Sequence, residues 1–120
     1  MSANLLDLIP IKIMKNEEKN EDGTITVFKP KFRNKFMIKY IMPKLKSPDF
    51  KVKLDEFGSF VWKQIDGNLT VEEIGLNLKD NFHENIEPVY ERLSVYFQTL
   101  LRYKFIEYKN YDPKQDKIIN

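Results

Sequence analysis

The chain has 120 residues and no cysteine, and 42% of its residues are hydrophobic. This length fits one domain with one core, the hydrophobic content argues against a disordered chain, and the lack of cysteine excludes a disulfide framework or a thiolate metal site. No apolar run approaches the roughly 18 residues that a membrane span needs. Residues 1–16 lack the pattern of a signal peptide, so we expect a cytoplasmic protein.

The net charge of +2 conceals an asymmetry between the two halves of the sequence. Residues 1–54 contain 12 Lys and Arg against 6 Asp and Glu, whereas residues 55–120 contain 8 against 12, so the halves carry +6 and −4. The most basic segment is 29–46, which has seven basic residues and no acidic one. Its basic residues are Lys29, Lys31, Arg33, Lys35, Lys39, Lys44 and Lys46.

The first elements in the chain are predicted strands. Residues 10–15 alternate apolar and basic side chains, which is typical of a strand with one buried face. Residues 16–23 are polar and predict a turn, and residues 24–30 resume with β-branched side chains until Pro30. The two apolar segments are therefore predicted to form a β-hairpin.

The basic segment begins where the second strand ends. Phe32, Phe36 and Tyr40 are spaced by four, so residues 31–42 are predicted to form an amphipathic helix that ends before Pro43.

A third strand is predicted over residues 50–54. Phe50, Val52 and Leu54 fall on one face, and Lys51 and Lys53 fall on the other. We expect this strand to complete a small antiparallel sheet.

From residue 55 onward the apolar period becomes helical. Asp55 is a candidate cap for a first helix, and the turn residues 66–68 end it. Thr70 and Glu73 have the spacing of a capping box and predict the start of a second helix.

A third helix is predicted to start near Asn85, with Pro88 in its first turn. Residues 103–108 then read as an extended piece. The order of elements predicts an α+β fold in which a three-stranded antiparallel sheet is followed by a three-helix group. We expect one domain over residues 1–109 with a basic insertion at about 29–48, followed by a polar tail at 110–120.

No combination of residues predicts catalysis. His83 is the only histidine, and a triad would need it beside Ser59 or Ser94 and oriented by Asp80, so we favour a polar loop residue. One histidine without cysteine does not make a zinc site. The glycines form neither a phosphate-binding loop nor a dinucleotide fingerprint, so no cofactor is predicted. These glycines are Gly23, Gly58, Gly67 and Gly75.

The segment 29–46 leaves two interpretations open. Positive charges interleaved with aromatic rings suit a nucleic-acid groove or an anionic membrane surface, because the charges neutralise phosphates and the rings stack or insert. The same pattern is also typical of a solvated helix face over a packed apolar side.

The stretch KLDEFGSFVWKQIDGNLTVEEI, residues 53–74, resembles the PqqD-like family of peptide chaperones and leader-peptide recognition elements. The similarity extends over about residues 10–107. The residues that carry the resemblance are Leu54, Asp55, Gly58, Trp62, Asp66, Gly67, Thr70, Glu73 and Ile74.

The resemblance implies a winged-helix-like fold and a binding role without catalysis. In such proteins a leader peptide adds as a strand to the third strand of the sheet and lies against the third helix, while a radical SAM enzyme modifies the peptide. Carried over to this chain, the peptide-binding residues would be Phe50, Lys51, Val52, Lys53 and Leu54 on the strand and Arg92, Tyr96 and Tyr103 on the helix.

The leading hypothesis is a non-catalytic chaperone that presents a ribosomally made precursor peptide to a modifying enzyme. The first alternative is a winged-helix nucleic-acid-binding protein that uses residues 29–46. A second is an adaptor that only docks on a larger enzyme. The sequence leaves the peptide, its modification and the choice between monomer and dimer open.

Overall fold

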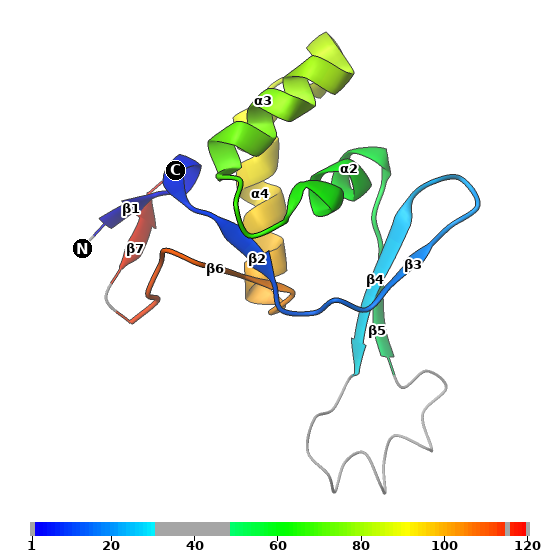
Figure 1. The fold of residues 1–120 in the computed structure, drawn as a ribbon, viewed down its shortest axis with the longest axis horizontal. Coiled ribbons are helices and arrows are strands. Elements are labelled where there is room, and N and C mark those ends of the chain that lie inside the picture. Colours follow the sequence, from blue (N-terminus) through cyan, green and yellow to red (C-terminus); the bar gives the residue numbers. More distant parts are fainter. Residues whose placement is uncertain (1, 31–48, 115, 120) are drawn as a thin grey trace, which may run out of the picture. The chain divides into compact units, whose positions relative to one another are not determined.

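The computed structural model describes residues 2–30, 49–114 and 116–119. The chain forms two compact units, one of residues 14–56, here the sheet unit, and one of residues 1–13 with 57–120, here the helical unit (Figure 1). Two units of this kind can belong to one domain, so the single domain over residues 1–109 stays a prediction.

The sheet unit contains one antiparallel sheet with the strand order β3-β4-β5. Its strands are β3 (Glu17–Lys19), β4 (Ile25–Pro30) and β5 (Asp49–Lys53), and β4 is the central one (Figure 1). The predicted small antiparallel sheet is therefore confirmed. The predicted helix at 31–42 lies outside the described residues.

The predicted hairpin between residues 10–15 and 24–30 is wrong. Strand β2 (Pro10–Lys12) pairs with β6 (Ile106–Tyr108), and the partner of β4 is β3, inside the segment predicted as a turn. All three β3 residues are exposed and charged, so β3 has no apolar alternation to reveal it. Charged edge strands of this kind protect a sheet from pairing with other chains.

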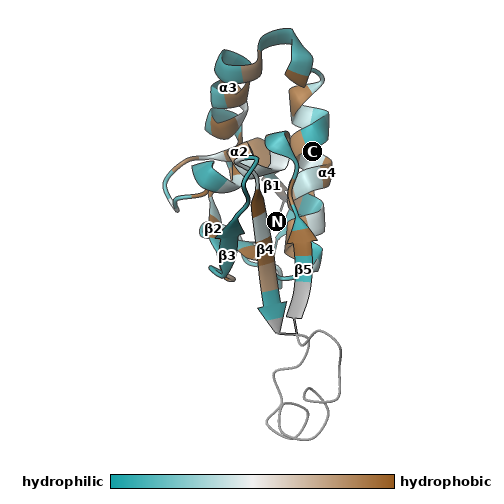
Figure 2. Ribbon diagram, turned by 90° about the vertical axis from the view of Figure 1, so that its right-hand side faces the viewer, coloured by the Kyte–Doolittle hydropathy of each residue, from teal (hydrophilic) through white to brown (hydrophobic). Residues whose placement is uncertain are grey.

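The helical unit contains α2 (Glu56–Gln64), α3 (Val71–Phe82) and α4 (Val89–Arg102), which confirms the three predicted helices. Figure 2 shows apolar and polar residues alternating around α3 and α4, as amphipathic helices require. Their apolar sides form a core with β6. Its largest fully buried side chains include Trp62, Ile74, Leu78, Leu93, Phe97, Phe105 and Ile106.

The predicted capping box at the start of α3 is confirmed. The Glu73 amide donates to Thr70 Oγ1 at 3.2 Å, and the Thr70 amide donates to Glu73 Oε1 at 3.0 Å. Ahead of it, the Asp66 carboxylate accepts from the amides of Asn68 and Leu69 at 2.8 and 3.0 Å. These two bonds hold the pKa of Asp66 below its usual value and fix the turn between α2 and α3.

The third helix begins later than predicted. Residues His83–Ile86 form a separate 3₁₀ helix, and Pro88 is the N-cap of α4 rather than part of its first turn. Glu87 is extended, with φ −70° and ψ 144°, because the ring of a following proline disfavours helical geometry.

The predicted polar tail includes a strand. In the helical unit, β7 (Lys117–Ile119) pairs in parallel with β1 (Ser2–Asn4), and a 3₁₀ helix, Leu5–Asp7, follows β1. Among the described residues, no helix is long and apolar enough to cross a membrane.

Candidate functional site

Strand β5 lies at one edge of the sheet, and its only strand partner in the described part of the chain is β4. The Leu54 amide donates to the Ile25 carbonyl at 2.9 Å, and the pairing continues with Val52 opposite Val27 and Phe50 opposite Lys29. In an antiparallel pair, alternate residues bond to the partner strand. The backbone groups of Asp49, Lys51 and Lys53 therefore point away from β4.

The side chains of β5 divide between two faces. Val52 is half-buried and lies opposite the fully buried Val27, and Leu54 is buried. Lys51 and Lys53 are exposed on the other face. The predicted alternation along β5 is confirmed for these residues.

The two lysines differ in their surroundings. Lys53 Nζ lies 3.4 Å from a carboxylate oxygen of Asp22 in the hairpin loop, and both side chains are exposed. Bonds from Thr24 chiefly, and Lys53 to a smaller extent, hold the pKa of Asp22 below its usual value. Lys51 Nζ lies 6.0 Å from the ring centroid of Phe28. Lys53 thus already has a counter-ion within the sheet unit.

The predicted residues of the third helix hold the helical unit together. Arg92 stacks its guanidinium 4.4 Å from the ring centroid of Phe57, and its Nη1 donates to the carbonyls of Asn85 and Ile86, each at 3.4 Å. Tyr96 donates to the Gly58 carbonyl at 2.8 Å.

Tyr96 also contacts the Phe57 ring edge-to-face at 5.8 Å between centroids, so Phe57 meets both Arg92 and Tyr96. Both side chains remain half-buried, with part of their surface accessible. Tyr103 is exposed at the C-cap of α4. Whether these residues join β5 in one peptide groove stays a prediction.

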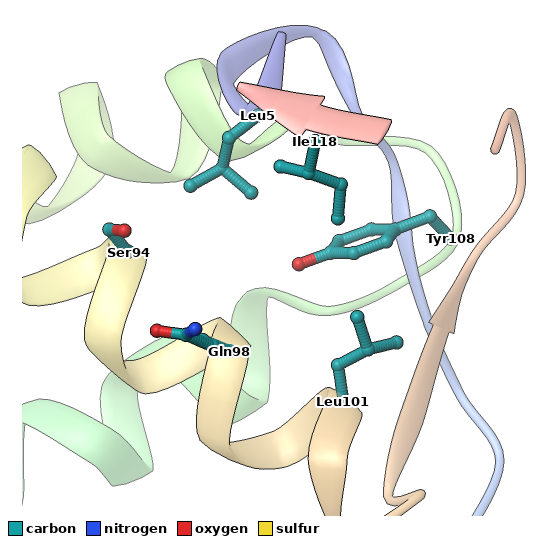
Figure 3. Close-up of a pocket in the computed structure, with 6 residues that line it drawn as sticks. All are labelled: Leu5, Ser94, Gln98, Leu101, Tyr108 and Ile118. Carbon is teal, nitrogen blue, oxygen red and sulfur yellow. The ribbon is translucent and has the colours of Figure 1, made fainter. Parts of the chain in front are cut away.

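A second feature was missed by the sequence analysis: a cavity of about 200 Å³ in the helical unit (Figure 3). Its walls come from the N-terminal 3₁₀ helix, one side of α4, β6 and β7. No short-range pattern could reveal it, because the contributing residues are spread over most of the chain. They are Leu5, Ser94, Gln98, Leu101, Tyr108 and Ile118.

The residues considered for catalysis lie on three separate elements. His83 is exposed at the end of α3, Ser59 is buried in α2, and Ser94 lines the cavity on α4. No group of three or more potential metal ligands occurs among the residues that the structure describes. Of the basic segment, Lys29 is half-buried on β4, and the six basic residues from Lys31 to Lys46 lie outside the described residues.

Residues 48–106 match the family model described as coenzyme PQQ synthesis protein D, PqqD. The chain belongs to the PqqD-like family. The matched region contains β5 and the three helices and ends at the first residue of β6. No curated protein and no solved structure matched the chain, so its winged-helix-like character stays a prediction.

Proposed function

We propose that this PqqD-like protein is a non-catalytic chaperone that binds a precursor peptide as an added strand on β5. The observation that carries the proposal is the outward backbone edge of β5, inside the region that matches the family model. An edge strand offers amide and carbonyl groups to any extended chain, which is the basis of binding by strand addition.

Residues Asp49, Lys51 and Lys53 supply the backbone groups for this pairing, whereas Phe50, Val52 and Leu54 bond to β4. The peptide would therefore bond to the outward backbone groups of β5, while the inward groups keep their hydrogen bonds to β4. The affinity of this kind of binding comes mainly from the backbone bonds, so selectivity must come from side-chain charges and pockets along the edge.

The exposed lysines favour a peptide with acidic residues near the bound segment. Since Lys53 already lies beside Asp22, Lys51 is the stronger candidate for an ion pair with the peptide. An exposed pair of this kind contributes only about 0.2–1 kcal/mol, so it would tune selectivity rather than supply most of the affinity.

The family description, coenzyme PQQ synthesis, supports a place beside an enzyme that modifies a peptide. We propose a radical SAM enzyme as this partner. Modification of the peptide by the purified enzyme should then be slow without the PqqD-like protein and fast with it.

The binding edge can be tested by placing the same substitution, Lys to Pro, once on each of the two opposite edges of the sheet. Peptides that co-purify with the full chain from its native lysate would be identified by mass spectrometry, resynthesised and titrated by fluorescence anisotropy. We expect a Kd near the micromolar range, about −8 kcal/mol, because ordering the peptide offsets much of the contact energy.

Lys51→Pro removes an outward amide of β5 and should weaken binding at least about tenfold, since proline cannot donate to an added strand. Lys19→Pro is the matched control. The backbone groups of Lys19 also point away from β4, but they lie on the opposite edge of the sheet, in β3. Circular dichroism would establish that both variants fold. Equal affinities of folded Lys51→Pro and Lys19→Pro would contradict strand addition at β5.

A further inference from the structure

The cavity beside α4 has mainly apolar walls, and none of the described residues that line it is charged. Leu5, Leu101 and Ile118 surround the space from three different elements (Figure 3). Gln98 is exposed whereas Leu5 is buried, so the cavity extends inward from the surface of the unit. An apolar cavity without charged groups suits an uncharged ligand, since burial of an unpaired charge is costly.

Tyr108 brings a polar group into this apolar space. Its side chain is 5% exposed, and its hydroxyl points into the cavity (Figure 3). No hydrogen bond joins this hydroxyl to any of the described residues. Burial, and to a smaller extent the neighbouring Tyr111, raises the pKa of Tyr108 above its ordinary value, so the hydroxyl stays protonated and can donate.

The ring of Tyr108 is buried, whereas its hydroxyl faces the cavity, where a ligand with a polar atom could form a hydrogen bond with it. Ser94 and Gln98 add two further polar groups, both on α4 and on the same side of the cavity (Figure 3). The cavity thus offers apolar contact on most sides and hydrogen bonding in one region.

We propose that this cavity binds an uncharged aromatic group that carries one hydrogen-bonding oxygen or nitrogen. The volume fits, because an apolar cavity of about 150 Å³ holds benzene, and about 200 Å³ leaves room for one or two additional heavy atoms. The polar atom of the ligand accepts from the Tyr108 hydroxyl, and Leu5, Leu101 and Ile118 contact the ring.

This site goes beyond the proposed peptide edge. It uses none of the β5 residues, and Leu5, Tyr108 and Ile118 lie outside the region that matches the PqqD model. Failure of one proposal therefore leaves the other untouched.

The test uses the full chain and two probes of the same chemistry. The first is p-cresol, a free small molecule, and the second is the blocked tripeptide acetyl-Gly-Tyr-Gly-amide, which presents the same ring as a peptide side chain. Binding is followed by amide chemical shifts in ¹H–¹⁵N NMR spectra. We expect saturable shifts at Ser94, Gln98, Tyr108 and Ile118, with toluene binding more weakly than p-cresol because it cannot accept from Tyr108.

Neighbouring residues of β7 give a matched pair of variants. Ile118 lines the cavity, whereas Ile119 is 51% exposed, so Ile118→Trp should fill the space and weaken p-cresol at least about tenfold while Ile119→Trp leaves it unchanged. Tyr108→Phe keeps the shape and should weaken p-cresol about three- to tenfold, the effect of one hydrogen bond. Tyr111→Phe is its control, because the Tyr111 hydroxyl donates to the Asp116 carbonyl instead.

The binding of the two probes and the affinities of the variants decide whether the cavity is a ligand site and what kind of molecule supplies the ligand. Binding of both probes would support the site and show that a peptide side chain can occupy it, whereas binding of p-cresol alone would support the site for free small molecules. The proposal is overturned if neither probe gives saturable shifts, or if the affinity for p-cresol is the same in the native chain, in folded Ile118→Trp and in Tyr108→Phe.

Discussion

The edge of β5 and the cavity beside α4 are candidate binding surfaces built in opposite ways. The edge consists of backbone groups from alternate residues of one short strand, Asp49, Lys51 and Lys53, and its geometry follows from pairing with one neighbouring strand. The cavity consists of side chains from positions as distant as Leu5 and Ile118. The edge should therefore tolerate many side-chain changes, whereas the cavity should depend on the packing of the helical unit.

The largest effect is expected from Phe97→Ala, a substitution that should disturb the cavity and leave the β5 edge intact. Phe97 is fully buried in α4, and its ring lies 6.5 Å from that of Tyr108. Phe97→Ala should lower the free energy of unfolding by about 3–5 kcal/mol and abolish p-cresol binding, because it removes the packing behind Tyr108. Urea denaturation followed by far-UV circular dichroism measures the first effect. Loss of amide protection at Val52 in the folded variant would show that the edge depends on the same packing.

A smaller change tests the contact between α3 and α4. A Cβ atom added at Gly75 would overlap the ring of Tyr90, whose hydroxyl donates to the Glu72 carbonyl at 3.3 Å. Gly75→Ala should therefore cost about 1–3 kcal/mol as the Tyr90 ring is displaced. A variant as stable as the native chain in urea would show that the Tyr90 ring moves aside at no cost.

The capping box offers a matched pair of threonines. Thr70→Ala should cost about 1 kcal/mol, because it removes the side-chain acceptor at the start of α3. In the native chain the Thr99 hydroxyl donates to the Val95 carbonyl within α4. Thr99→Ala removes this bond, and we expect the free energy of unfolding to fall by no more than about 0.5 kcal/mol. Thermal denaturation of the two variants gives the comparison. Similar losses in both would argue against a special role for the cap.

The smallest effect appears only in alkaline solution. Burial raises the pKa of Tyr108 above its ordinary value of 10.0, so the unfolded chain releases this proton at a lower pH than the folded chain does. The stability of the helical unit should therefore fall as the pH rises above about 10, where the folded state binds more protons. Tyr108→Phe should make this fall shallower, which urea denaturation at a series of pH values would measure.

Some alkaline destabilisation should persist in Tyr108→Phe. Burial chiefly, and the nearby charges of Glu72 and Glu87, also raise the pKa of Tyr90. A slope unchanged by Tyr108→Phe would mean that the Tyr108 hydroxyl reaches water in the folded chain.

The sequence was informative wherever structure depends on neighbours in the chain. The alternation was confirmed over residues 51–54, and the capping box of Thr70 and Glu73 was confirmed too, because each involves residues only a few positions apart. The predicted start of α4 was about one helical turn too early. The extended geometry that Pro88 imposes on the residue before it outweighed the apolar periodicity.

Pairing over long distances was not predictable. Strand β2 pairs with β6, some 95 positions away, and the periodicity of a strand does not name its partner. Strand β3 lacks apolar residues, so only its bonds to β4 define it. The same limit explains why the cavity was missed, as its lining residues range from Leu5, directly after β1, to Ile118 in β7, the strand that pairs with β1.

The single tryptophan of the chain also has a practical consequence. Trp62 lies in the helical unit with its indole fully buried, and Lys12 Nζ is 4.7 Å from the ring centroid. Tryptophan fluorescence therefore reports the unfolding of the helical unit and gives no signal from the sheet unit. Far-UV circular dichroism sees both, so melting curves that disagree between the two signals would reveal units that unfold separately, and curves that coincide would reveal one cooperative transition.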